Sequence, residues 1–169
     1  KDQHVYAFRR FSFTPMNGML PVSNIFLISI QDQHRNQLSL AWNASSPILQ
    51  KAVRKVNGLT TMQSFTLTYD ASLNLTQITD TSINRSVYFY YNTDGTLASV
   101  KDARNNTTSY SYDTDKLLKS IIYPEGNVHN FTYDSMRLSS NSHSGVSLGY
   151  TYNPDNTVVT GPQGAITYT

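Results

Sequence analysis

A tyrosine followed by aspartate or asparagine recurs along the 169-residue chain at nearly constant spacing. The pairs are Tyr69-Asp70, Tyr91-Asn92, Tyr112-Asp113, Tyr133-Asp134 and Tyr152-Asn153. Trp42-Asn43 fits as a degenerate earlier copy, after which a somewhat longer interval leads to Tyr69. Self-similarity at a period of roughly 20 to 50 residues is typical of a repeat array, and the tyrosines recur near the lower limit of that range. The sequence therefore predicts a stack of one small unit.

The unit contains two strands and two turns. After Tyr91-Asn92 come a polar turn, an alternating strand that starts at Leu97, a second turn over 102–106, and a strand over 107–112. The next copy repeats this order, with its second turn over 124–127 and a strand from Val128 to Tyr133. Alternating strands bounded by Asn, Asp and Gly indicate β-hairpins. We expect an all-β fold, a repeat array of antiparallel hairpins that forms a curved, ribbon-like sheet with about five to six repeats.

The dipeptide is expected to be scaffold. A tyrosine at a strand end packs its ring on the neighbouring repeat while its hydroxyl reaches water or a partner. The Asp or Asn that follows closes an Asx-turn on its own backbone. Gly95 and Gly126 supply the positive φ that such turns often need. The predicted structural residues are therefore the six dipeptides together with these two glycines.

The composition excludes several classes of protein. Charged residues make up 14% of the chain and the net charge is +2, so no concentrated basic face marks a nucleic-acid or membrane-surface binder. The chain has no cysteine, which excludes disulfides and thiolate metal sites. Its longest apolar run, 25–28, is far too short to span a bilayer. The chain begins with Lys1 instead of Met, which favours a processed or excised piece.

The stretch over 1–64 is less regular. Val5 to Phe13 suits a strand, 16–19 between two prolines suits a loop, and 24–30 with 37–42 suits a hairpin around Asp32 to Asn36. Ser46 to Gly58 carries helix signals, namely an N-cap Ser, Pro at the first position and Gly at the end. The repeat register instead favours a strand near 52–56 after a short insertion. We expect an irregular segment with one strand over residues 1–23 and one continuous hairpin array over 24–169.

These residues resemble the RHS/YD-repeat family, which includes bacterial RHS and wall-associated proteins, toxin-complex shells and the teneurins. The resemblance covers about 24–169 and rests on five dipeptides in phase, with Gly95, Leu97, Val100 and Asp102 in place in one unit. Serine or asparagine often replaces the family's glycine, and the Arg before Leu is kept only at Arg137. The resemblance implies a hairpin ribbon that, in long arrays, spirals into a hollow shell around a toxic domain or forms an extracellular adhesion scaffold.

Motifs that could carry chemistry are weak. Gly145 to Gly149 matches the G-x-S-x-G pattern around Ser147, but strand and turn residues follow where a nucleophile elbow needs a helix. Asn92 to Gly95 resembles the start of a calcium loop, but Tyr90 and Lys101 occupy ligand positions. No two of the four histidines have metal-ligand spacing in one element. We expect no enzyme activity, no cofactor and no metal site.

The leading hypothesis is a non-catalytic, extracellular or exported β-scaffold. It would be either a segment of a shell or a surface element that pairs with copies of itself through its sheet edges. The alternative is a carbohydrate-binding or adhesion module with an exposed tyrosine face, formed by Tyr88, Tyr90, Tyr110, Tyr112, Tyr150 and Tyr152. Six sequons are candidates for N-glycosylation, at Asn43, Asn74, Asn84, Asn105, Asn106 and Asn130. The partners expected are the rest of a longer repeat chain, copies of this chain or carbohydrate, with no nucleic acid and no membrane span.

Overall fold

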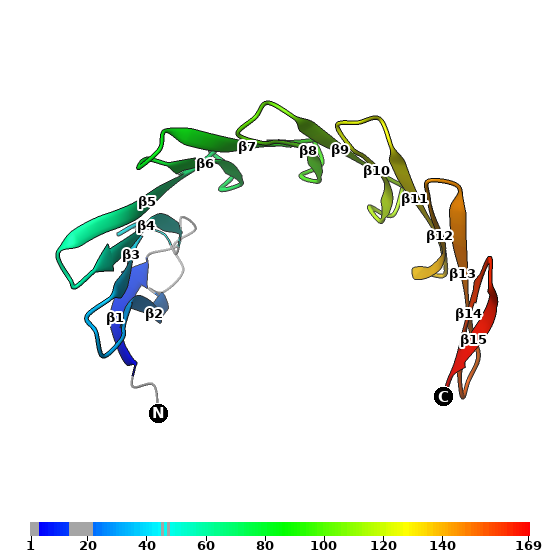
Figure 1. Ribbon diagram of the computed structural model, residues 1–169, viewed down its shortest axis with the longest axis horizontal. Helices are drawn as coiled ribbons and strands as arrows, with labels where there is room; N and C mark the ends of the chain where they lie inside the picture. Colours follow the sequence, from blue (N-terminus) through cyan, green and yellow to red (C-terminus); the bar gives the residue numbers. More distant parts are fainter. Residues whose placement is uncertain (1–3, 14–21, 45, 47) are drawn as a thin grey trace. The chain divides into compact units, whose positions relative to one another are not determined.

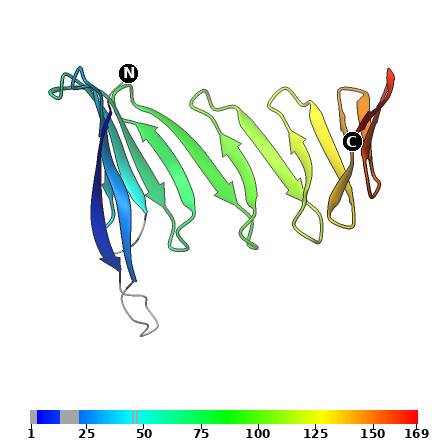
Figure 2. The same cartoon turned by 90° about the horizontal axis from the view of Figure 1, so that it is seen from below.

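The computed structural model describes residues 4–13, 22–44, 46 and 48–169. These residues form fifteen strands and no helix, and the strands follow one another in chain order (Figure 1). Neighbouring strands run in opposite directions (Figure 2). Their bounds are β1 Val5–Phe13, β2 Val22–Gln31, β3 Gln37–Trp42, β4 Leu49–Val56, β5 Thr60–Tyr69, β6 Leu75–Asp80, β7 Arg85–Tyr91, β8 Leu97–Lys101, β9 Thr107–Tyr112, β10 Leu118–Ile122, β11 Val128–Asp134, β12 Arg137–His143, β13 Val146–Tyr152, β14 Thr157–Gly161 and β15 Gly164–Tyr168. The all-β hairpin array is thus confirmed.

The chain divides into two units, Lys1–Tyr88 and Phe89–Thr169. The first unit contains β1 to β6 and most of β7, and the second contains the end of β7 and β8 to β15. Within each unit, the described strands contact only the strands next to them in chain order. This nearest-neighbour pattern is the defining property of a repeat array.

The segment with mixed helix and strand signals is a strand. β4 covers Leu49–Val56 and pairs along its length with β3 on one side and β5 on the other. The expected N-cap and first helical proline are followed by extended backbone because ladder hydrogen bonds on both sides of β4 outweigh local helix propensity. Asn57 and Gly58, with φ of 52° and 69°, then form the turn into β5.

β1 and β2 extend the sheet toward the N-terminus. β1 has the predicted bounds, and β2 begins at Val22, slightly before the predicted start at Asn24. The two strands pair from Val5↔Gln31 to Phe13↔Val22. The ring of Phe26 packs between those of Phe11 and Trp42, with centroid separations of 5.8 and 4.6 Å. The predicted loop over 16–19 lies outside the described residues.

The array has a thin, half-buried interior. Among the described residues, Ser64 is the only buried side chain, and no large side chain is fully enclosed. Most strand residues that face a neighbouring side chain remain half-buried instead. Stability in such a sheet depends on ladder hydrogen bonds and on cross-strand side-chain pairs, each of which contributes about 0.2–1 kcal/mol.

Candidate functional site: the tyrosine–leucine connections between hairpins

The aromatic residues of the repeat stand where one hairpin ends. Trp42, Tyr69, Tyr91, Tyr112 and Tyr152 each end a strand, and Tyr133 is the second-last residue of β11. The rings of Trp42, Tyr69, Tyr91, Tyr112 and Tyr133 are half-buried, whereas that of Tyr152 is 40% exposed. The ring therefore lies between consecutive hairpins, as inter-repeat packing requires.

Four of these aromatic side chains, those of Trp42, Tyr69, Tyr133 and Tyr152, donate a hydrogen bond to the preceding hairpin. The Tyr69 hydroxyl donates to the Leu49 carbonyl over 2.8 Å, and the Tyr133 hydroxyl donates to the Leu118 carbonyl over 2.9 Å. Two further bonds have the same form, Tyr152 Oη to the Leu138 carbonyl at 3.0 Å and Trp42 Nε1 to the Leu27 carbonyl at 2.9 Å. Tyrosine and tryptophan share an apolar ring with a polar donor, so Trp42 replaces tyrosine without loss of the bond.

The accepting leucine always occupies the same place in its own repeat. Leu49 pairs with Trp42, Leu118 with Tyr112, and Leu138 with Tyr133. One aromatic residue therefore faces a leucine across the strand, and the next aromatic residue bonds to that leucine's carbonyl. The leucine is the link between two successive dipeptides.

A β-bulge follows this leucine in each of these hairpins. The register skips Gln50, Thr76, Lys119 and Ser139, the residues directly after Leu49, Leu75, Leu118 and Leu138. A bulge adds one residue to a strand and increases its local twist. The same irregularity occurs after Leu27, where Phe8 takes the place of the aromatic partner. The recurring bulge was not predicted, since the residue after the leucine varies from polar at Gln50 to apolar at Ile28 and gives no common sequence signal.

The residue after the tyrosine builds the turn. The Asp70 Oδ1 accepts hydrogen bonds from the backbone N–H groups of Ser72 and Asn74, both at 2.9 Å. Asp113 Oδ1 accepts from Asp115 and Leu117 in the same way. The first N–H of each turn donates to the fifth carbonyl, and the fourth residue has positive φ. The Asx-turn predicted for these two residues is present.

This five-residue turn occurs six times in the described part of the chain, at both ends of the hairpins. The copies are 32–36, 70–74, 92–96, 102–106, 113–117 and 123–127. Gly95 and Gly126 hold the fourth position with φ of 85° and 86°, as predicted. Arg35, Leu73, Asn105 and Lys116 hold it with φ between 62° and 68°. An Asp-x-x-x-Asn pattern marks three copies and would have identified the 32–36 turn as a repeat element.

Three dipeptides depart from this geometry: the N–H of Asn43 donates to the Ile48 carbonyl, one residue beyond the usual acceptor, and Asp134 and Asn153 differ as follows. Asp134 pairs with Arg137 across a two-residue turn, Ser135 and Met136, which have φ of 51° and 66°. Its Oδ1 accepts a hydrogen bond from the Ser135 hydroxyl, and it closes no five-residue turn. Asn153 instead bonds through its Nδ2 to Asn156 Oδ1 and through its N–H to the Asn156 carbonyl. The shorter turn after Asp134 accounts for part of the reduced interval between Tyr133 and Tyr152.

The pKa values of four turn aspartates are lowered, whereas those of two tyrosines are raised. The Asn74 side chain, then its backbone N–H, lowers the pKa of Asp70. Hydrogen bonds from Asn36, Thr96 and Asn106 likewise lower the pKa values of Asp32, Asp94 and Asp102. Burial raises the pKa of Tyr69 and that of Tyr112, the latter against a hydrogen bond from the Leu97 backbone. The lowered pKa values favour the ionised aspartates that accept hydrogen bonds in the turns, and the raised pKa values favour the protonated tyrosines.

The sequons lie in different environments. Asn74 and Asn106 donate their Nδ2 to the Oδ2 of Asp70 and Asp102, at 3.1 and 3.0 Å. Asn84 and Asn105 stand exposed at positive-φ turn positions. Asn43 follows Trp42 and its N–H donates to the Ile48 carbonyl, while Asn130 is exposed within β11. Glycosylation at Asn74 or Asn106 would therefore compete with a turn, whereas at Asn84 or Asn105 it would not.

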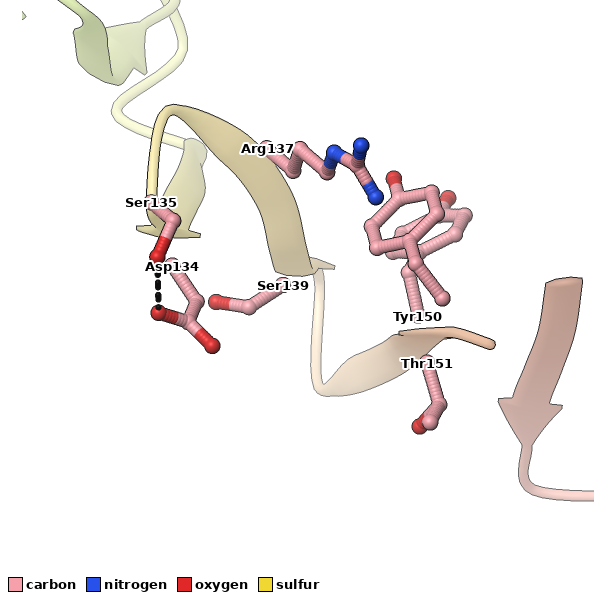
Figure 3. Close-up of a pocket in the computed structure, with 7 residues that line it drawn as sticks. Asp134, Ser135, Arg137, Ser139, Tyr150 and Thr151 are labelled. Carbon is pink, nitrogen blue, oxygen red and sulfur yellow. Dashed lines mark hydrogen bonds between the residues drawn. The ribbon is translucent and has the colours of Figure 1, made fainter. Parts of the chain in front are cut away.

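The tyrosine face is only partly open. Tyr88, Tyr90 and Tyr152 are 38%, 49% and 40% exposed, whereas Tyr110, Tyr112 and Tyr150 are half-buried. A hollow of about 470 Å³ adjoins Tyr150 and Tyr152 and is lined by Asp134, Ser135, Arg137, Ser139, Tyr150, Thr151 and Tyr152 (Figure 3). The Arg137 guanidinium carbon lies 5.5 Å from the Tyr152 ring centroid, a cation–π contact. The Tyr150 hydroxyl accepts a hydrogen bond from Asn141 Nδ2 at 3.0 Å.

The weaker motifs acquire no catalytic geometry. Ser147 is exposed within β13 and faces Ser142 across the ladder, so it has no strand-to-helix elbow. Ser144 and Gly145 form the turn before it, with φ of 50° and 81°. Within the described residues, no three His, Asp or Glu side chains gather as metal ligands. Those residues also contain no helix long and apolar enough to cross a membrane. His129 and His143, however, are direct cross-strand partners, which spacing along the sequence could not indicate.

A hairpin array with recurring aromatic connections and recurring five-residue turns is typical of a YD-repeat protein. The family model "Teneurin YD-shell" matches residues 22–160, and the chain therefore belongs to this family. The resemblance to the YD-repeat family is confirmed. No curated protein sequence matches the chain.

Several solved structures share the fold. A crystal structure of TcdB2-TccC3 has a TM-score of 0.64 and 17% identity, and the alignment covers 94% of this chain and 10% of that one. The Tc holotoxin pore of Photorhabdus luminescens has a TM-score of 0.63 and 16% identity, with 94% and 9% covered. A crystal structure of TcdB2-TccC3-TEV has a TM-score of 0.64 and 16% identity, and the alignment covers 94% of this chain and 9% of that one. The chain thus spans about a tenth of the length of these solved chains.

Proposed function

We propose that this chain is a non-catalytic structural segment of a YD shell, in which each hairpin is fixed to the one before it by the tyrosine–leucine connection. The observation that carries the proposal is the recurrence of one bond at one place, from Trp42 to Leu27, from Tyr69 to Leu49, and onward through the array. A scaffold must repeat the same joint many times, whereas a catalytic site needs unlike groups to converge once.

The partners are proposed to be neighbouring strands at the two sheet edges. β1 and β15 are the first and last strands in the order, and each pairs with one described strand. Every residue of β15 is exposed, with Ile166 at 60% and Tyr168 at 58%. A hollow of about 510 Å³ beside it is lined by apolar residues that include Val146, Leu148 and Val159. An exposed edge of this kind is a template for another strand.

The strand that pairs there belongs either to a longer chain or to a second copy. The intact mass of the native chain under denaturing conditions distinguishes the two. A mass above that of these 169 residues by whole protein segments favours a segment of a longer shell. A mass near that of the 169 residues, or above it in sugar-sized steps, favours pairing between copies. Sugar-sized steps would also support the proposed extracellular or exported location.

Edge variants test the pairing itself. If copies pair through their edges, sedimentation analysis of the wild-type chain shows particles larger than one chain, and Ile166→Lys or Val5→Lys returns them to monomers because a charge on an edge opposes strand addition. Thr151→Lys, exposed on β13 between two paired strands, is the control and leaves particle size unchanged. An unchanged particle size in both edge variants would contradict self-pairing.

Carbohydrate binding is a second candidate, and the hollow at Tyr150 and Tyr152 favours it. Its lining combines aromatic rings with Asp134 and Arg137, the groups that stack on and hydrogen-bond to sugars. One face of Tyr152 is already covered by the Arg137 guanidinium, which narrows the surface left for a sugar. A glycan array with the wild type and Tyr150→Ala tests it. Binding that is lost while the circular dichroism spectrum is kept would support a glycan site, and no binding by the wild type would reject it.

A further inference from the structure

Two histidines from different strands meet on one face of the second unit. His129 of β11 and His143 of β12 are direct partners in the antiparallel ladder, and their ring centroids lie 5.3 Å apart. Directly opposed residues have Cβ atoms about 4.5–5.5 Å apart, so both imidazoles extend from neighbouring points of a rigid frame. A pair held in this way resembles a chelating group more than two independent surface histidines.

The separation of the rings matches one particular coordination geometry. A tetrahedral ion about 2.0–2.1 Å from a nitrogen of each ring places the two ring centroids about 5.2 Å apart. The observed 5.3 Å between His129 and His143 agrees with this value. Octahedral cis coordination at the same bond length would bring the centroids to about 4.5 Å.

Neighbouring aromatic rings hold both imidazoles in place. His129 stacks on Phe131, with 4.4 Å between centroids and 24° between planes. His143 meets Tyr123 edge to face at 5.7 Å and 78°. Ligands that are positioned before the metal arrives lose less freedom on binding, which strengthens a site with few protein ligands.

One ring nitrogen lacks a partner that the protein supplies. His129 Nε2 is shielded from solvent and makes no hydrogen bond within the described residues. A shielded polar atom of this kind calls for an explanation, and an absent ion is one of the accepted ones. Nitrogen of neutral imidazole is a preferred ligand of Zn²⁺, which takes the tetrahedral geometry that the ring separation matches.

We propose that His129 and His143 form a two-histidine site for Zn²⁺ or another divalent ion of tetrahedral preference, which joins β11 to β12, with water completing the coordination. This site is independent of the shell function proposed above, because it involves neither a dipeptide nor a sheet edge. A bound ion would stabilise the folded chain by mass action, since the unfolded chain does not hold the two rings together.

Calorimetric titration of the 169-residue chain with ZnCl2, an ion of tetrahedral preference, tests the proposal. We expect one ion per chain, and a Kd raised about tenfold or more, equivalent to about 1.4 kcal/mol, in His129→Gln and in His143→Gln. His34→Gln, at an exposed turn, is the matched control and should leave the Kd unchanged. Equal Kd values for the wild type and both site variants would overturn the proposal.

A measurement on the wild type keeps the test valid if a variant fails to fold. The visible spectrum of the Co²⁺-loaded wild-type chain should show the intense d–d absorption bands of tetrahedral coordination. Only the weak bands of octahedral Co²⁺ would overturn the proposal. The melting temperature supplies a second readout, because ZnCl2 should raise it in the wild type and in His34→Gln but not in His143→Gln.

Discussion

The Tyr133 hydroxyl donates a hydrogen bond to the Leu118 carbonyl at 2.9 Å, and Leu118 itself faces Tyr112, the tyrosine of the preceding repeat. Two successive dipeptides are thereby joined through one backbone carbonyl. The tyrosine of the repeat therefore has two structural tasks, to fill the space between hairpins with its ring and to set their spacing with its hydroxyl.

Tyr133→Phe should lower the free energy of unfolding by about 0.5–1.5 kcal/mol, because it removes one hydrogen bond and keeps the ring. Tyr168→Phe, at a ring that is 58% exposed, is the control and should change it by less than about 0.5 kcal/mol. Urea unfolding followed by circular dichroism measures both. Equal effects of the two substitutions would show that the Tyr133 hydroxyl contributes nothing.

Acid should weaken the hairpin turns. The pKa values of Asp32, Asp70, Asp94 and Asp102 are lowered in the folded chain, so the unfolded chain binds more protons as pH falls below about 3.9. Their contribution is present above that pH and is lost as pH falls through the folded pKa values. We expect the urea midpoint of the wild type to drop between pH 5 and pH 3, and the drop to be smaller when these four residues are replaced by Asn.

High pH should weaken the tyrosine–leucine connections between hairpins. Burial raises the pKa values of Tyr69 and Tyr112, so their folded-state contribution is complete below about pH 10 and is lost as pH rises through the higher folded values. A spectroscopic titration of tyrosinate should therefore show a late-ionising fraction. Tyr69→Phe and Tyr112→Phe should each reduce that fraction. A titration in which all phenols ionise together would disprove the effect of burial.

Gly126→Ala should destabilise the chain by about 1–2 kcal/mol, because an alanine at φ of 86° suffers the left-handed strain although no atom lies within 4 Å of its Cβ. Leu73→Ala is the matched control at the same turn position. Its Cβ already occupies the left-handed region, at φ of 65°, and its side chain is 54% exposed, so the backbone strain is unchanged. Thermal unfolding of both variants measures the difference, and equal losses would contradict the argument.

The sequence predicted the hairpins and the Asx-turns because both depend on residues close together in the chain. Tyr112 and Asp113, for example, mark a strand end and a turn by themselves. The acceptor of the Tyr133 hydroxyl lies far back in the chain, at Leu118, and its identity depends on the strand register and on the bulge at Lys119. The meeting of His129 with His143 depends on register in the same way.

The positive φ at Leu73 and Lys116 could not be predicted from the sequence either, because neither residue favours it. The aspartate at the start of the turn imposes it, since Asp70 and Asp113 each hold two N–H groups of the turn. The glycine positions, in contrast, could be predicted because glycine alone adopts this conformation without strain. In the 70–74 and 113–117 turns the aspartate therefore supports the positive φ that glycine supports in the 92–96 and 123–127 turns.

Contacts confined to successive strands leave the length of the array free to change during evolution. A duplicated stretch from one tyrosine to the next, such as 112–132, would bring its own leucine acceptor, bulge and turn. It would need only the standard joint at each end, and no buried interior would have to be redesigned around it. Gain or loss of whole hairpins by recombination should therefore disturb the folded structure of this chain little. Insertion of one residue within a strand would instead shift its register and exchange the two faces on which its side chains lie.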